Sequence, residues 1–121
     1  MCGSQNSATS EFLGALKSIF IEDFLVIWAL SLLACTCLKN NPEKGVPYAE
    51  EMKTEIEKNS VFDKSFRINR LEILVFLYAS TNRLNEACHL AEQLLQEALS
   101  LECVDEALVA ECQYTLAIQI Q

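Results

Sequence analysis

Glycine, proline and histidine are scarce in this sequence. Its 121 residues include three glycines, two prolines and one histidine. So few glycines exclude a glycine-rich phosphate-binding loop, and so few helix-breaking residues favour a mostly helical chain. The single histidine, His89, and the lack of any Cys-x-x-Cys spacing leave no convincing set of zinc ligands. We therefore expect neither a bound metal nor a cofactor.

Basic residues are nearly absent from the second half of the chain. Residues 71–121 contain Arg83 as their sole basic residue against eight acidic ones, and the whole chain has a net charge of −8. A surface this acidic repels phosphate backbones, so nucleic acid is excluded as a partner for this half. The short basic group Lys64, Arg67 and Arg70 is typical of a solvated helix face.

Catalytic arrangements of side chains are also missing. Cys88 and His89 are adjacent in sequence, but consecutive residues of a helix point about 100° apart and do not face each other. Cys35 and Cys37 diverge by about 200° on a helix, which makes a poor metal chelate. The glutamate pairs around residues 50–57 have no nucleophile or base beside them. The sequence therefore predicts a protein that is not an enzyme.

Six cysteines are present, and four of them lie within apolar helical patterns. A free cysteine in such a position behaves as a small apolar residue, and a chain this apolar does not need disulfides to fold. The pattern indicates a reducing compartment, the cytoplasm or the nucleus.

The longest apolar run, Phe24–Leu38, contains no charged residue. Its fifteen residues span about 22 Å as a helix, which is short for a membrane span. Glu22 and Asp23 precede it directly, which argues against both a membrane anchor and an export signal. Because a helix that is apolar all round is usually buried, we expect Phe24–Leu38 to be the central helix of the fold.

The remaining residues predict further helices around this one. Residues 1–10 are small and polar, which is typical of a disordered tail or a remnant of cloning, and residues 11–121 form one helical domain. Asn, Pro and Gly cluster over 39–48 and predict a loop, with Pro47 in the first turn of a second helix. Residues 71–80 resemble a strand in composition, but no second strand exists to pair with them. The predicted helices cover approximately 11–38, 47–59, 63–80, 84–101 and 102–121.

The expected fold class is therefore all-α, with about five helices in antiparallel pairs, as a helical repeat or a small orthogonal bundle. Within it, residues 71–101 resemble a tetratricopeptide-type helical hairpin. The resemblance lies in the order of large and small residues and in a turn residue, Asn82, that tolerates a left-handed backbone. The matching positions are Leu71, Leu74, Val75, Tyr78, Asn82, Ala87, Ala91 and Leu94.

This resemblance implies protein recognition through a groove lined by the first helix of each hairpin. The groove positions carried over to this sequence are Asn69, Glu72, Phe76, Ala79 and Ser80. Glu72 and Phe76 stand where the subclass that grips a C-terminal carboxylate has Lys and Asn. The resemblance therefore implies a partner peptide of apolar or basic character.

The preferred hypothesis is a non-catalytic protein–protein interaction module, acting as an adaptor or as a subunit of a larger assembly. Apolar residues on both terminal helices also allow self-association into a homo-oligomer. Two alternatives stay open: a membrane-associated helical protein that inserts residues 24–38, and a bundle that encloses an apolar ligand. The aromatic residues considered for such an enclosure are Phe24, Trp28, Phe76 and Tyr78.

Overall fold

The fold of this chain is all-α, as the sequence predicted. The computed structural model describes the backbone of residues 2–59, 62–101 and 103–120, and the side chains from residue 21 to residue 119 within those ranges. No strand occurs in these three ranges. The five helices are α1 (Cys2–Asn40), α2 (Pro42–Lys58), α3 (Lys64–Ser80), α4 (Leu84–Leu99) and α5 (Glu106–Ile120).

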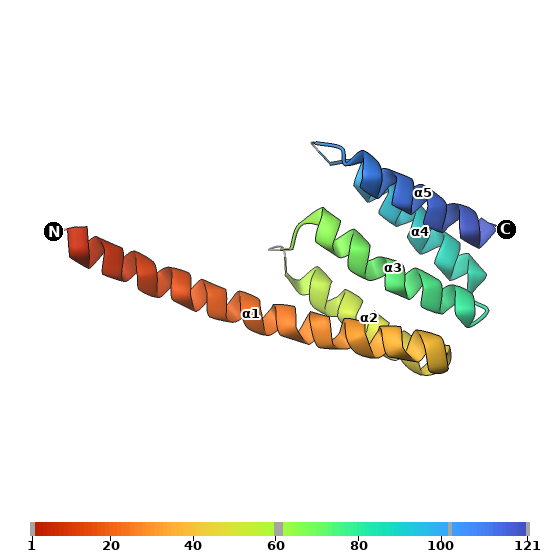
Figure 1. The fold of residues 1–121 in the computed structure, drawn as a ribbon, viewed down its shortest axis with the longest axis horizontal. Coiled ribbons are helices and arrows are strands. Elements are labelled where there is room, and N and C mark those ends of the chain that lie inside the picture. The colour runs from red at the N-terminus through yellow and green to blue at the C-terminus, as the bar shows by residue number, and fades with distance from the viewer. Residues whose placement is uncertain (1, 60–61, 102, 121) are drawn as a thin grey trace.

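The helices form an up-and-down array in which each one packs antiparallel to the next along the chain (Figure 1). α1 lies at one end of the array and α5 at the other. α3 lies in the middle, between α2 and α4, and it also contacts α1 and α5. α1 is much longer than the other helices, and its N-terminal part extends beyond them (Figure 1).

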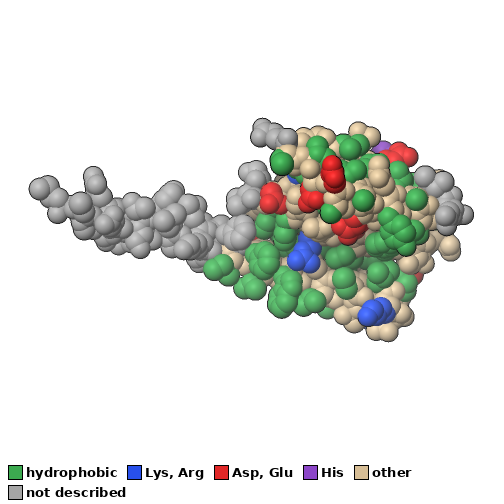
Figure 2. All heavy atoms as spheres, turned by 45° about the horizontal axis from the view of Figure 1, so that its top comes forward, with side chains coloured by type: hydrophobic (Ala, Val, Ile, Leu, Met, Phe, Trp, Pro, Cys, Tyr) green, Lys and Arg blue, Asp and Glu red, His purple; other side chains and the backbone are tan. Residues whose placement is uncertain are grey.

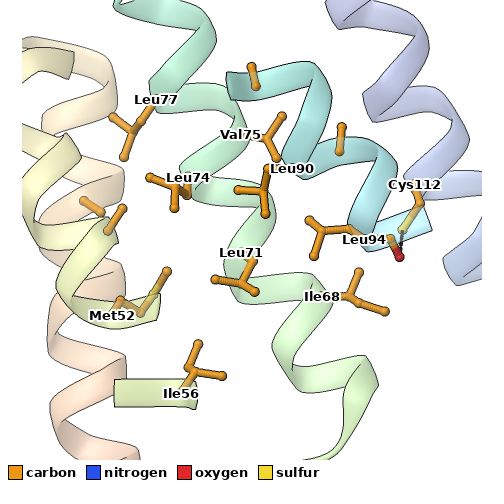
Figure 3. Packing of buried hydrophobic residues seen from close by; sticks show 14 of the residues in the cluster. Met52, Ile56, Ile68, Leu71, Leu74, Val75, Leu77, Leu90, Leu94 and Cys112 are labelled. Carbon is orange, nitrogen blue, oxygen red and sulfur yellow. Dashed lines mark hydrogen bonds between the residues drawn. The ribbon is translucent and has the colours of Figure 1, made fainter. Parts of the chain in front are cut away.

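The centre of the core is α3. Its side chains Ile68, Leu74, Val75 and Leu77 are fully inaccessible to solvent, and Leu71 nearly so. Figure 3 shows these residues between the apolar side chains of α2 and those of α4. A helix in the middle of a layered array has neighbours on both sides, and for this reason α3 is the most completely buried.

The prediction that Phe24–Leu38 is the buried central helix is wrong. α1 lies at the edge of the array, where only its inner side, with Ile27, Leu30, Ser31 and Ala34, is buried. The opposite side of the same segment is exposed to solvent. The apolar character of the run showed that it favours burial, but it held no information on which helices lie beside it.

The boundary between α1 and α2 also differs from the prediction. The expected loop over 39–48 is reduced to Asn41, and α2 begins at Pro42 rather than Pro47. Pro42 takes the first helical position, where its missing N–H is not needed. α1 itself begins at Cys2, within the segment 1–10 that was expected to be a disordered tail.

Close packing of α2 against its neighbours requires a glycine at position 45. A Cβ atom at this position would lie 2.8 Å from Leu77 Cδ2 and 2.9 Å from Cys37 Cβ. The backbone of α2 therefore approaches α1 and α3 more closely than any residue with a side chain would allow. The glycine that looked like a loop former is a packing residue.

The boundaries of α3 and the start of α4 follow the predictions, whereas α5 begins at Glu106, four residues later than predicted. Asp63 precedes α3, and its Oδ1 accepts a hydrogen bond from Phe66 N over 2.8 Å, which caps the helix. Asn82 has a φ of 62°, the left-handed conformation expected for the turn between α3 and α4. Asp105 caps α5 in the same way, accepting from Ala107 N and Leu108 N over 3.0 and 3.2 Å.

We expect Gly45→Ala to lower the free energy of unfolding by up to about 2 kcal/mol. The added methyl group overpacks the contact with Cys37, which costs about 1–3 kcal/mol, and this outweighs the ~1 kcal/mol that alanine gains in helix propensity. Urea unfolding followed by circular dichroism measures the change. Thr54→Ala, on the exposed side of α2, is the matched control and should not destabilise the chain; equal stability of the two variants would contradict the packing role.

Candidate functional site: the exposed faces of the helical array

The most unusual surface of the protein is the outward side of α1. Six large apolar side chains are between 45% and 53% exposed there, which we call the α1 outer face: Ile21, Leu25, Val26, Trp28, Leu32 and Leu33. Figure 2 shows hydrophobic side chains gathered along this part of the molecule. Single exposed apolar residues are normal on a protein surface, but a contiguous row of six is unusual.

Helical periodicity separates this face from the core. The buried residues Ile27, Leu30 and Ala34 recur at intervals of three and four, so they share one side of α1. Leu25 and Leu32 occupy the other side. Because both sides are apolar, α1 is able to pack on α2 and still present an apolar surface to a second body.

The segment Ile21–Asn40 is long and apolar enough to cross a membrane, judged by length and composition alone. Only 22% of its most apolar window is buried inside the folded chain. Its inner side nevertheless makes specific contacts, including a hydrogen bond from Ser31 Oγ to Ile27 O over 2.7 Å beside Met52 Sδ at 3.0 Å. Ser31 therefore lies on the side of α1 that faces α2.

The five groove positions implied by the repeat resemblance follow the helical spacing of one side of α3. Asn69 and Ser80 are exposed, and Phe76 and Ala79 are half-buried. Glu72 differs from the expectation of an exposed groove residue, because it is only 6% exposed. α5 packs over this position, and the Thr115 hydroxyl donates a hydrogen bond to Glu72 Oε2 over 2.7 Å.

Glu72 places a carboxyl group in the core, where it is 6% exposed. Its second oxygen, Oε1, is buried and has no hydrogen-bond partner. Burial raises the pKa of the Glu72 carboxyl above its ordinary value; the Thr115 hydrogen bond opposes this shift and the nearby Glu111 charge adds to it. The carboxylate therefore lowers the stability of the fold at neutral pH.

A groove of about 640 Å³ lies between α2 and α4, and residues of α3 also line it. Lys53 and Glu57 line one side and His89 and Glu92 the other. At its floor Arg67 of α3 forms an ion pair with Glu97 of α4, with Nη2 and Oε1 3.0 Å apart. Sequence reasoning missed this groove, because its lining comes from separate helices that no motif connects.

The groove contains no recognisable catalytic arrangement. His89 is exposed, while the thiol of Cys88 points to Gln119 O of α5 at 3.7 Å. The prediction that these neighbours do not face each other is confirmed. Among the side chains that the structure describes, no group of three or more His, Cys, Asp or Glu residues is placed to hold a metal ion.

The described cysteines are free thiols in different environments. Cys35 and Cys103 are exposed, and Cys37 and Cys88 are half-buried. Cys112 is buried against α4, and burial raises its thiol pKa to about 11. Because the thiolate is the reactive form, Cys112 is a packing residue and not a nucleophile.

Three of the four aromatic residues considered for a ligand enclosure, Phe24, Trp28 and Tyr78, have different surroundings. Trp28 is 47% exposed on the α1 outer face. Phe24 packs against Phe66, with ring centroids 5.9 Å apart, and Tyr78 donates a hydrogen bond to Glu50 Oε2 over 3.0 Å. The structure therefore does not bring these side chains together around one cavity.

Comparison with known proteins found no matching family model, no matching curated protein and no matching solved structure. The exposed faces of the helices are therefore the basis for a functional proposal.

We expect Glu72→Gln to raise the melting temperature at pH 7 by several degrees. The amide keeps an acceptor for the Thr115 hydroxyl and removes the buried charge. Because the folded-state pKa of Glu72 lies above the unfolded value, its destabilising effect is complete above the folded-state pKa and disappears as the pH falls towards the ordinary value of 4.5. The advantage of the variant should therefore vanish in acid.

Thermal unfolding between pH 4 and pH 8 measures this dependence. Glu92→Gln is the control, since it makes the same change at an exposed position and should shift the melting temperature little at any pH. A Glu72→Gln variant that is less stable than the unmodified chain at pH 7 would show that the charge is stabilising.

Proposed function

We propose that this chain is a non-catalytic protein–protein interaction module that acts as an adaptor or as a subunit of a larger assembly. The observation that carries this proposal is the α1 outer face. A folded chain that leaves six large apolar side chains about half exposed on one helix gains stability when another body covers them, at about 25 cal/mol for each Å² of apolar surface removed from water.

The other end of the array supports the same function. Tyr114 and Ile118 of α5 are 68% and 39% exposed, and Val104 just before it is 47% exposed. Both terminal helices of the array therefore present apolar side chains. Repeat-like arrays of helices use such faces to add neighbouring units or to hold partners.

The proposed repeat relationship concerns the hairpin of α3 and α4. Its turn at Asn82 has the left-handed backbone that such a hairpin needs. In this proposal Asn69, Phe76, Ala79 and Ser80 face a partner peptide, while Glu72 is covered by α5. The acidic second half of the chain favours a partner of basic or apolar character.

The free thiols support a reducing compartment as the place of action, the cytoplasm or the nucleus. None of the five cysteines from Cys35 to Cys112 within the described side chains is in a disulfide. Disulfides persist in oxidising compartments and are rare where thiols are kept reduced.

A second candidate function is membrane association through α1. It is favoured by the length and apolar composition of Ile21–Asn40. Helices that lie on a membrane surface usually carry basic residues on their polar side, whereas the charged residues of this segment are Glu22, Asp23 and Lys39. The net charge of −8 also repels anionic lipids.

The test replaces two leucines of the α1 outer face. We expect Leu25→Gln/Leu32→Gln to remain folded and to lose protein association, seen by size-exclusion chromatography with light scattering and by affinity capture from cell extract. Leu84→Gln/Leu99→Gln is the matched control, because these leucines are similarly exposed on α4, at 52% and 47%. The control should keep every association of the unmodified chain.

The proposal fails if the unmodified chain is a monomer and captures no protein whose binding depends on Leu25 and Leu32. Flotation with neutral phosphatidylcholine vesicles separates the second candidate. Vesicle binding that the α1 variant loses and the α4 variant keeps would favour the membrane.

A further inference from the structure

We infer that the α1 outer face binds a second copy of this chain, through an antiparallel pair of α1 helices centred between Leu30 and Ser31. This inference rests on the proposed interaction function and names its partner. It is carried by a row of exposed positions spaced alternately by three and four residues, which we call the α1 seam: Glu22, Leu25, Ala29, Leu32, Thr36 and Lys39.

The spacing of the α1 seam is the spacing by which two helices pack along their length. Alternation of three and four residues keeps one row of side chains facing a partner helix. All six seam residues are exposed, and they lie opposite Ile27, Leu30 and Ala34, which bind α1 to its own chain. The two interfaces therefore use separate sides of the same helix.

The sizes of the seam residues are complementary only in the antiparallel arrangement. With the midpoint between Leu30 and Ser31, Leu25 lies opposite Thr36 of the second copy, and Leu32 lies opposite Ala29. Each large side chain meets a small one, which allows close packing at every level. A parallel, in-register pair instead places leucine against leucine and leaves a gap where alanine meets alanine.

The charges at the two ends of the seam select the same arrangement. The antiparallel register places Glu22 opposite Lys39 of the second copy, and the twofold symmetry repeats this pair at the other end. Neither side chain has an ion-pair partner among the residues that the structure describes. In a parallel pair Glu22 would meet Glu22, and Lys39 would meet Lys39, which is unfavourable.

The seam does not bury an unsatisfied polar group in this arrangement. Thr36 is its only uncharged polar residue, and its hydroxyl already donates a hydrogen bond to Leu32 O of its own helix over 2.8 Å. Two copies also supply the same apolar face to each other, as an isologous interface requires. A lipid surface would satisfy the apolar residues but would leave Glu22 and Lys39 without this pairing.

Charge reversal on the full-length chain tests the pairing. We expect the unmodified chain to be a dimer by sedimentation equilibrium, and Glu22→Lys or Lys39→Glu alone to weaken dimerisation by about tenfold at low salt, since two attractive pairs become repulsive. The Glu22→Lys/Lys39→Glu chain should recover the original affinity. An equimolar mixture of the two single variants should form heterodimers of that affinity, because each pairs with the other at both ends.

Trp28 supplies an independent readout. It is the single tryptophan of the chain and lies beside the seam, 47% exposed. Its emission should shift to shorter wavelength as the unmodified chain dimerises with rising protein concentration. The single charge variants should reach the same shift only at higher protein concentration. Glu51→Lys and Lys44→Glu, at exposed positions of α2, are matched controls that should dimerise like the unmodified chain.

Three outcomes would overturn the inference. The unmodified chain could be monomeric at every concentration, or the single variants could dimerise with the same affinity as the unmodified chain. The third is a mixture of the two single variants that dimerises no more tightly than either variant alone. A monomer that still captures another protein through Leu25 and Leu32 would remove self-pairing and leave the proposed function standing. A monomer that binds vesicles through the same residues would replace both with the membrane candidate.

Discussion

The close packing of α2 against α1 at Gly45 holds one side of α1 against its own chain. The absence of a side chain at Gly45 lets Cys37 and Leu77 approach within van der Waals distance of the backbone. On this side of α1 Ile27, Leu30 and Ala34 are buried, whereas Leu25, Trp28 and Leu32 on the other side are exposed. The apolar outer face is therefore a consequence of packing, since α1 has apolar residues on every side and only one side has neighbours within the chain.

The position of each helix in the array accounts for the difference between α1 and α3. α3 has neighbours on both sides and a fully buried core side, whereas α1 and α5 each have a free side. The fully buried side chains accordingly gather at the centre, and exposed apolar side chains lie on the end helices. The buried carboxylate of Glu72 is the exception, because it reduces stability where α3 meets α5 without a complete set of hydrogen bonds.

Sequence patterns predicted which segments are helical more accurately than they predicted the position of each helix in the array. The caps and turns around α3 and α4 rest on local chemistry: α3 begins beside Asp63 and the turn has its left-handed residue at Asn82, as expected. Pro42 and Gly45 were misinterpreted as loop residues. The sequence alone does not distinguish a glycine that permits close helix packing from a glycine in a turn. The groove between α2 and α4 left no trace in the sequence, since residues such as Lys53 and His89 come together only by folding.

The sequence by itself determined that this chain is helical, since helix-breaking residues are few and apolar residues recur at helical spacing. It also determined that Phe24–Leu38 favours an apolar environment. Only the tertiary structure decided that this segment lies at the edge of the array with Leu25 and Leu32 facing outward. The physical reason is that hydrophobic free energy depends on the area removed from water and not on direction, so it does not specify whether the covering atoms belong to the same chain or to another.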